Sequence, residues 1–388
     1  MSKSCLNIAV IGVGAMGQVH CETIRDSVPE LCLTAVCNAR SETARVAGER
    51  FGVPWFSDVK ELAASGLADV ALVVVPHPVH DVASVPCMEA GMHVLCEKPL
   101  TESVVSADKM FAAANAKGVA FGVMFQLRAD PAIRRMIEFA RDGGLGRIIR
   151  AELSVPEFRS QYYFDSNPWR ATWSGEGGGV LLNQASHMID IFAMVAGTPV
   201  ALYGRCETRL HDIDVEDTAE ALLRFDGGGS GYINCSTTEP AGGGGLEVTG
   251  DNGRVIMRDG RVRIFRFPTG VSAFARETES VWGRPQQELV FEGECLEEPA
   301  QADVLQNFAR HILYGEALWC DAASGMASLE IANAMTLSSA LGREISLPIE
   351  RKAYGDLLAS YCAKPARPKR RVSMVQEPDP KFSFNKKT

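Results

Sequence analysis

Three features are missing from this 388-residue sequence, and each absence excludes a class of protein. It contains no apolar run of about 18 residues, the length that a membrane-spanning helix needs. No signal peptide precedes the first apolar segment, which begins at Leu6, so we expect a cytoplasmic protein. There is no excess of basic residues either. The net charge is −9 at pH 7, which argues against a general nucleic-acid binder.

The sequence also lacks any C-x-x-C pair, although it has eleven cysteines. That number is odd, and Cys5, Cys32, Cys37 and Cys235 lie within apolar segments. Scattered cysteines of this kind are typical of reduced thiols that pack as small, buried hydrophobic side chains. We therefore predict neither a disulfide framework nor a metal site.

The most informative motif lies near the N-terminus, where the apolar residues 6–11 lead directly into Gly12-Val13-Gly14-Ala15-Met16-Gly17. A G-x-G-x-x-G pattern between a strand and a helix is typical of dinucleotide binding. Gly12 allows the tight turn, Gly14 lets the backbone approach a pyrophosphate, and Gly17 lets the helix pack closely on the strand. We predict that this turn binds a nicotinamide or flavin cofactor; the alternative is a glycine-rich turn without a ligand.

The choice between NAD and NADP depends on the end of the second apolar segment, residues 31–37. NAD-specific enzymes normally place an acidic residue there, about 20 positions after the glycines, to bind the ribose hydroxyls. Here that place is taken by Asn38, which can hydrogen-bond the ribose but does not repel a 2′-phosphate. Arg40 could pair with such a phosphate or could be a solvated residue at a helix start, so both cofactors stay open.

The first third of the chain alternates short apolar segments with helical patterns. Strands that are almost wholly apolar and are separated by helices indicate a parallel sheet that is covered on both faces. We therefore predict an α/β Rossmann domain over residues 1–126. Its strands are expected at 6–11, 31–37, 70–75, 92–96 and 119–123, and its helices at 16–27, 41–51, 58–65, 79–90 and 103–117.

From about residue 147 the pattern changes to longer strands and hairpin turns. These features predict an α+β domain for substrate binding and oligomerisation over residues 127–350, with a large, mostly antiparallel sheet. Because one face of such a sheet is often covered by a partner subunit, we expect a homo-oligomer. The turns are Asp226-Gly227-Gly228-Gly229, Asn252-Gly253 and Asp259-Gly260, and helical patterns occur at 180–196, 301–315 and 323–341.

The last segment, residues 351–388, is predicted to be a short helix followed by a Pro-rich tail that begins at Lys364. The tail has eight Lys or Arg residues and two acidic ones, a net charge of +6. A basic tail could contact nucleic acid or an anionic surface. We favour a solvated segment, or one extended along an acidic neighbouring subunit.

Two further segments carry side chains suited to catalysis. Glu97-Lys98-Pro99 directly follows a predicted strand, and Pro99 keeps Lys98 extended at the carboxyl edge of the sheet, where Rossmann ligands bind. Lys98 would lie near a nicotinamide and a substrate hydroxyl, although an ordinary surface lysine at a strand end is equally compatible with its position.

The second segment begins with Gly177-Gly178-Gly179 and continues as a helical pattern that contains Asn183 and His187. Residues at i and i+4 share one face of a helix. A single histidine on a helix is usually structural, but an Asn/His pair after three glycines is a better site candidate. Imidazole titrates near neutral pH and suits proton removal from an alcohol.

Together these segments resemble the Gfo/Idh/MocA family, which includes glucose–fructose oxidoreductase and inositol dehydrogenase. The resemblance extends from about residue 5 to about residue 350. Its matching pieces are the glycine motif with His20, Pro76 with His80, Glu97-Lys98-Pro99, Gln126-x-Arg128, and the three glycines leading to His187 and Asp190.

The resemblance implies an NAD(P)-dependent oxidoreductase of sugars or cyclitols that assembles as a dimer or tetramer. The catalytic lysine of the family falls on Lys98 and its catalytic histidine on His187. It also implies cofactor contacts from Pro76, His80 and Glu97, and substrate contacts from the remaining matching pair, Gln126 and Arg128. Many members have aspartate where this sequence has Asn183, which can orient a substrate hydroxyl but cannot raise the basicity of His187 as a carboxylate would.

An aromatic-rich segment, residues 161–173, precedes the three glycines. The faces of Tyr163 and Trp169 could stack on a sugar ring or a planar aglycone, and Arg170 could bind a carboxylate or phosphate. Core packing or a dimer contact would explain the same residues.

We predict a sugar dehydrogenase that transfers a hydride at a secondary alcohol, and the favoured reaction is oxidation of a glycoside to its 3-oxo form. A UDP-sugar acid and then a cyclitol are the next substrates in order. Three other functions stay open: an NAD-dependent glycosidase of the same family, a carbonyl reductase working in the opposite direction, and a non-catalytic sugar-sensing regulator. Retention of Lys98 and His187 argues against the sensor.

Overall fold

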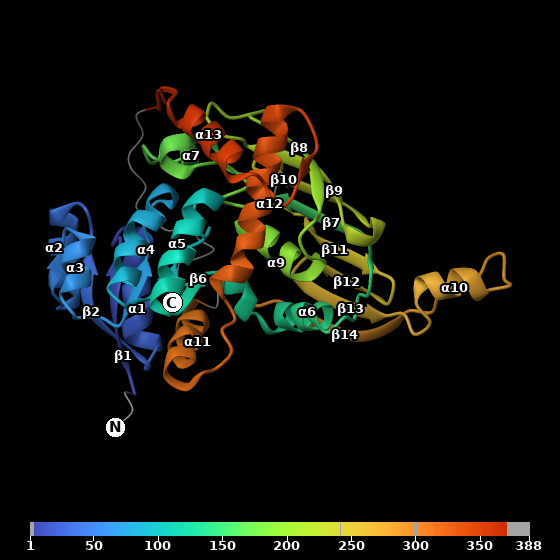
Figure 1. The fold of residues 1–388 in the computed structure, drawn as a ribbon, viewed down its shortest axis with the longest axis horizontal. Coiled ribbons are helices and arrows are strands. Elements are labelled where there is room, and N and C mark those ends of the chain that lie inside the picture. Colours follow the sequence, from blue (N-terminus) through green and yellow to red (C-terminus); the bar gives the residue numbers. More distant parts are fainter. Residues whose placement is uncertain (1–3, 241, 298–300, 371–388) are drawn as a thin grey trace.

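The computed structural model describes residues 4–240, 242–297 and 301–370. In these ranges the chain forms two sheets that lie at opposite ends of the long axis, with helices packed between them (Figure 1). The sequence after residue 370, which includes most of the predicted basic tail, lies outside the described residues.

The first sheet has six parallel strands in the order β3-β2-β1-β4-β5-β6, which confirms the predicted Rossmann fold. The strand order reverses between β1 and β4, and the carboxyl ends of the strands at such a point form a ligand-binding crevice. The strands are β1 (Leu6–Ile11), β2 (Leu31–Cys37), β3 (Trp55–Phe56), β4 (Val70–Val73), β5 (His93–Cys96) and β6 (Phe121–Val123).

The helices of this half lie close to the predicted positions, because their apolar faces pack on an apolar sheet. They are α1 (Ala15–Ser27), α2 (Ser41–Phe51), α3 (Val59–Ala64), α4 (His80–Glu89) and α5 (Val104–Lys117). Short 3-10 turns, η1 (His77–Val79) and η2 (Gln126–Ala129), follow β4 and β6 at the carboxyl edge of the sheet.

The second sheet has nine strands in the order β14-β13-β12-β11-β7-β10-β9-β8-β15, and every neighbouring pair is antiparallel except β7 with β10. The predicted glycine turns join β9 to β10, β11 to β12 and β12 to β13. The strands are β7 (Ile148–Pro156), β8 (Ala201–Glu207), β9 (Thr218–Arg224), β10 (Ser230–Ser236), β11 (Gly245–Gly250), β12 (Gly253–Arg258), β13 (Arg261–Arg266), β14 (Glu288–Glu294) and β15 (Ile345–Ser346).

The long helix α12 (Ala322–Leu341) joins the two halves, since it packs on α5 and β6 of the first and on α9 and β8 of the second (Figure 1). The other helices are α6 (Pro131–Arg141), α7 (Gln161–Asp165), α8 (Trp173–Glu176), α9 (Ser186–Ala196), α10 (Val271–Glu277), α11 (Gln301–Tyr314) and α13 (Arg351–Cys362). In Figure 1, α10 projects from the end of the second half.

Two predictions about local structure were wrong. The helix expected over 180–196 begins only at Ser186, because the preceding residues form a turn in which the Ala185 N–H bonds to the Val180 carbonyl, five residues back instead of four. The eleven cysteines are free but not uniformly buried: Cys32 and Cys362 are exposed, since each lies on the outward face of its element. Among the described residues, no helix is both long and apolar enough to cross a membrane.

Candidate active site

The glycine turn after β1 has the shape that a pyrophosphate requires. Gly12 has a φ of +94°, and a Cβ added to it would lie 2.1 Å from the Val74 carbonyl oxygen. A Cβ on Gly17 would lie 1.9 Å from the carbonyl oxygen of Gly12. A Cβ on Gly14 would have no neighbour within 4 Å, and no side chain caps the first turn of α1 there. The space beside Gly14 at the N-terminus of α1 is therefore open, which fits the phosphates of a dinucleotide.

At the end of β2, the side-chain oxygen of Asn38 accepts a 3.0 Å hydrogen bond from the main-chain N–H of Arg40. This contact fixes the start of the loop into α2 and leaves Arg40 exposed. In a Rossmann fold, residues at this position lie next to the ribose of a bound dinucleotide.

Glu97 and Lys98 follow β5 at the same edge of the sheet. The Glu97 carboxylate lies 2.7 Å from the Nε2 of buried His20 and accepts a 3.0 Å bond from the N–H of Lys98. Burial opposes ionisation of Glu97, but His20 and Lys98 outweigh it, so the pKa of this carboxyl is lowered. The Lys98 ammonium donates a 2.9 Å hydrogen bond to the carbonyl of Asn183, and burial lowers the pKa of Lys98.

His187 lies in the first turn of α9 and is 8% exposed. Among the described residues, neither of its ring nitrogens has a hydrogen-bond partner. Burial, followed by the nearby charge of Lys98, lowers the pKa of His187 to about 3. The imidazole is therefore neutral at physiological pH, and a lone pair is available to accept a proton.

Two buried carboxyl groups that the sequence analysis missed hold the turn over residues 177–185. Glu216 accepts hydrogen bonds of 2.9 and 3.2 Å from the N–H groups of Gly179 and Leu181. A Cβ on Gly179 would lie 1.9 Å from the Glu216 carbonyl oxygen, which explains why glycine is needed there. Glu176 bonds to the side-chain nitrogen of Asn183. Glu176 directly precedes the three glycines, so its role in this turn could have been predicted from the sequence. Glu216 is distant in sequence, and no local pattern pointed to it.

The aromatic loop lies against this turn. The Tyr163 hydroxyl contacts the side-chain nitrogens of Gln184 at 3.1 Å and Asn183 at 3.4 Å, and it also accepts from Arg170. The Arg170 guanidinium lies over the rings of Tyr163 and Trp169, 4.1 and 4.8 Å from their centres. The loop therefore brings its three predicted residues together beside Asn183, with the ring faces partly covered by a cation.

The segment after α13 runs back along this loop and contacts it through Lys369. The Lys369 ammonium donates to the carbonyls of Phe164 and Asn167 at 2.8 and 2.7 Å, and also to that of Arg170. Arg367 forms a 2.8 Å ion pair with Asp212. Residues 364–368 and 370 are exposed, as expected of a solvated segment, but Arg367 and Lys369 also bind acidic residues and loop carbonyls of the same chain.

Four other predicted site residues make contacts within the protein. Arg128 forms a buried bidentate pair with Asp190, at 2.6 and 2.7 Å, which ties η2 to α9. His80 bonds to the Val75 and Leu100 carbonyls and thereby joins the ends of β4 and β5. These contacts hold together the elements that surround the candidate site. The other two are Gln126, which is buried in η2, and Pro76, which precedes η1. Among the described residues, no group of His, Cys, Asp or Glu side chains could hold a metal ion.

Two family models match the chain. One describes an oxidoreductase family with an NAD-binding Rossmann fold and matches residues 6–125, and the other describes a GFO/IDH/MocA C-terminal domain and matches residues 133–256. A curated relative, scyllo-inositol 2-dehydrogenase (NAD(+)) of Bacillus subtilis, is 26% identical over 89% of this chain and 98% of its own length. Trans-1,2-dihydrobenzene-1,2-diol dehydrogenase of Mus musculus is 30% identical over 55% of this chain, but the match spans only 63% of that protein.

Solved structures agree with these matches. The WlbA dehydrogenase of Chromobacterium violaceum, determined in complex with NADH and UDP-GlcNAcA, has a TM-score of 0.75 and 25% identity over 90% of this chain and 98% of that chain. A levoglucosan dehydrogenase in complex with NADH has a TM-score of 0.73 at 21% identity, covering 89% of this chain and all of that chain. It is similar in fold.

Proposed function

Because this chain belongs to the GFO/IDH/MocA family of oxidoreductases, we propose that it oxidises a secondary alcohol on the ring of a sugar or cyclitol. NAD(P) bound at residues 12–17 supplies the hydride acceptor. The main support for the proposal is that the half-buried ammonium of Lys98 lies close to the neutral imidazole of His187, whose ring nitrogens have no hydrogen-bond partner among the described residues.

In the proposed reaction, a ring nitrogen of His187 accepts the proton of the substrate hydroxyl as the carbon loses its hydride. The Lys98 ammonium, which uses one of its three donors on Asn183, offers another to the same oxygen and stabilises its developing negative charge. Asn183, held by Glu176, orients a neighbouring hydroxyl. The product is a ketone at the oxidised carbon.

For the substrate, we propose a glycoside that is oxidised to its 3-oxo form. The support is the aromatic loop over residues 161–173, which lies against Asn183 and Gln184 and leaves the substrate side of the site bounded by large rings. An aglycone is the part of a glycoside that such rings would contact.

The second candidate is a sugar acid, including a UDP-sugar acid. Guanidinium groups lie over the ring of Tyr163 from both Arg159 and Arg170, at 5.3 and 4.1 Å from its centre. A carboxylate on the substrate would be attracted to this cluster. The WlbA structure with UDP-GlcNAcA supports the same alternative.

The test is a substrate panel of aryl glucosides, UDP-GlcNAcA and inositols, each with NAD+ and with NADP+. Reduced cofactor and a product lighter by two hydrogens are expected from an aryl glucoside. Turnover of UDP-GlcNAcA or inositols alone would overturn the glycoside proposal but retain the dehydrogenase. Release of free sugar would instead indicate the glycosidase, and cofactor binding without turnover of any member would indicate the sensor.

We also propose that the protein is a homo-oligomer. Tyr203, Leu222 and Tyr232 are directly opposite one another on β8, β9 and β10, and all three side chains are exposed. An exposed apolar row across three neighbouring strands of a sheet is a surface that a second copy would cover. The Leu222→Glu variant is expected to shift the protein to monomer in sedimentation velocity, and an unchanged sedimentation coefficient would contradict this.

A further inference from the structure

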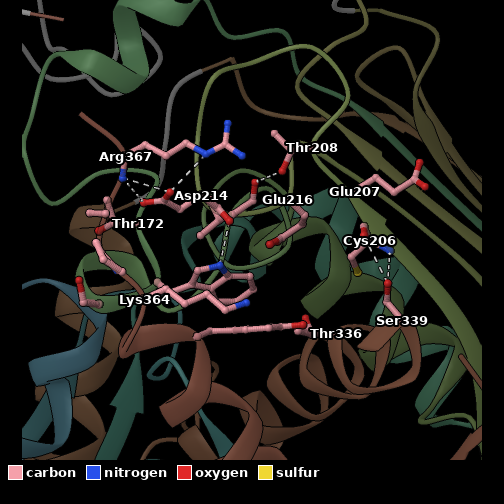
Figure 2. A pocket seen from close by; sticks show the side chains of 16 residues that line it. Thr172, Cys206, Glu207, Thr208, Asp214, Glu216, Thr336, Ser339, Lys364 and Arg367 are labelled. Carbon is pink, nitrogen blue, oxygen red and sulfur yellow. Dashed lines mark hydrogen bonds and ion pairs between the residues drawn. The ribbon is translucent and has the colours of Figure 1, made fainter. Parts of the chain in front are cut away.

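A cavity of about 430 Å³ lies beside the turn over residues 177–185, and neither Lys98 nor His187 lines it. Its volume is within the range of small-molecule sites, roughly 300–1,000 Å³. Figure 2 shows its walls, which come from the loop at Thr172, the end of β8, the segment that contains Glu216, helix α12, and the segment after α13.

Glu216 lines the cavity and has one buried carboxyl oxygen without a partner among the described residues. Glu216 is 4% exposed, and its Oε1 accepts from the N–H groups of Gly179 and Leu181. Its Oε2 has no hydrogen-bond partner among the described residues. A buried polar atom without a partner is costly, and native proteins usually satisfy it with protein, water or a ligand.

The hydroxyl groups of the wall present further acceptors. Thr208, Thr336 and Ser339 each donate their hydrogen to a carbonyl of the protein. Oxygen lone pairs remain for a ligand on Thr208 and Thr336, whereas the Ser339 oxygen already accepts a 2.9 Å hydrogen bond from the Cys206 N–H. The carbonyls are those of Val215, Ala332 and Cys206. With Glu216 Oε2, this set favours a ligand that donates several hydrogen bonds.

The charged groups at the cavity already have partners. Arg367 pairs with Asp212 and Asp214, and Glu207 pairs with Arg205 and Arg209. The Lys364 ammonium lies over the Tyr361 ring, 4.8 Å from its centre. The Tyr361 ring in turn contacts Trp173, with 4.5 Å between the ring centres. The lining therefore requires no ion, and it includes an aromatic pair of the kind on which sugar C–H groups pack.

We propose that this cavity is a second binding site, specific for a neutral polyol of the size of a monosaccharide or cyclitol. Hydroxyl groups of the ligand donate to Glu216 Oε2 and to the oxygens of Thr336 and Thr208, and its carbon face contacts Trp173 and Tyr361. Because the other oxygen of Glu216 holds the catalytic turn, the bound polyol also restrains that turn. The site does not depend on which substrate the catalytic centre takes.

Burial raises the pKa of Glu216 to about 7. A hydroxyl can donate to the ionised carboxylate and can accept from the protonated acid. A polyol thus satisfies Glu216 in either state, whereas an ammonium ligand would satisfy only the ionised form.

The binding test uses equilibrium dialysis of the full chain with radiolabelled myo-inositol and D-glucose as probes. The Ala366→Trp variant fills the cavity from its exposed rim, and Ala363→Trp adds the same side chain at an exposed position outside the lining. One bound polyol per chain is expected to disappear in Ala366→Trp and to remain in Ala363→Trp. Equal binding of the polyols by the two variants would overturn the site. It would also be overturned if Ala366→Trp lost binding of methylammonium but not of the polyols.

Two further measurements separate the hydroxyl contacts from simple filling of the cavity. Thr336→Val keeps the side-chain volume but removes one acceptor, so the polyol affinity is expected to fall about fivefold. Hydrogen exchange of the peptide over residues 177–185 is expected to slow when myo-inositol is added to Ala363→Trp but not to Ala366→Trp. An unchanged affinity in Thr336→Val would contradict the assigned contact, and equal exchange in both variants would contradict the restraint of the turn.

Discussion

The Lys98 ammonium is joined to the main-chain carbonyl of Asn183 by a 2.9 Å hydrogen bond. This contact ties the carboxyl end of β5 to the turn before α9, and so connects the cofactor half of the molecule to the segment that carries His187. The carbonyl can accept this bond because Glu216 and Glu176 hold the turn in place. The lysine is thereby positioned before any substrate arrives.

Loss of this ammonium is expected to impair catalysis more than cofactor binding. We predict that Lys98→Ala lowers kcat by about 100-fold or more, because the developing oxyanion loses its charged donor. The dissociation constant for NAD(P)H, measured by fluorescence titration, should change little. A near-normal kcat in Lys98→Ala would contradict the role assigned to this residue.

His187 gives a prediction with a pH signature. His187→Ala is expected to lower kcat by about 100-fold or more, because no other base is assigned to the substrate hydroxyl. The pKa of His187 is about 3, so kcat/KM of the wild-type enzyme should show no loss from this group as the pH falls from neutrality to about 5. An inflection near the ordinary histidine pKa, present in the wild type and absent in His187→Ala, would contradict the buried neutral state.

Arg40 is the residue that distinguishes the two nucleotides. If its exposed guanidinium meets a 2′-phosphate, Arg40→Ala should weaken NADP(H) binding by about 1–3 kcal/mol and leave NAD(H) binding unchanged. Arg45→Ala is the matched control, because that arginine lies in α2, the helix that Arg40 precedes, but pairs with Glu42 and Glu49. Equal effects on both nucleotides, or none, would make Arg40 a surface residue.

Lys369 gives a prediction about substrate affinity. Its ammonium binds three carbonyls of the loop at 164–170, so Lys369→Met is expected to loosen that loop. KM for the sugar should rise by about fivefold or more, the equivalent of one charged hydrogen bond, while kcat stays within about twofold. Arg370→Met removes an exposed neighbouring charge and serves as the control. The same KM in both variants would mean that the contact does not order the loop.

Glu216 makes stability depend on pH. Burial raises its pKa from 4.5 to about 7 in the folded protein, so the folded state holds a proton that the unfolded state releases. Its contribution is therefore fully present below about pH 4.5 and is lost as the pH rises through 7. Glu216→Gln should stabilise the protein at pH 8, by about 3 kcal/mol at most, and the difference should disappear below pH 5. Chemical unfolding at the two pH values measures it, and a pH-independent difference would contradict the assignment.

The sequence alone determined the local elements and the cofactor half of the fold. β1 and β2 occupy the predicted residues because continuous apolar runs bounded by a glycine turn have few alternatives to buried parallel strands. The glycines at 12, 14 and 17 predicted a phosphate cradle, since their spacing reflects backbone contacts that form within one turn. Lys98 and His187 were predicted as site candidates from local signals of the same kind, since Lys98 precedes a proline and His187 follows a run of three glycines.

The tertiary structure decided what these residues contact. Glu216 lies 37 positions from Gly179, and it accepts hydrogen bonds from the N–H groups of Gly179 and Leu181 in the turn that precedes α9. Arg128 pairs with Asp190, 62 positions away, and Lys369 returns to a loop about 200 positions earlier. Helical periodicity describes bonds over three or four residues, whereas these contacts depend on how two sheets and α12 pack together. Long-range burial of charge has no local pattern, so only the folded chain could show it.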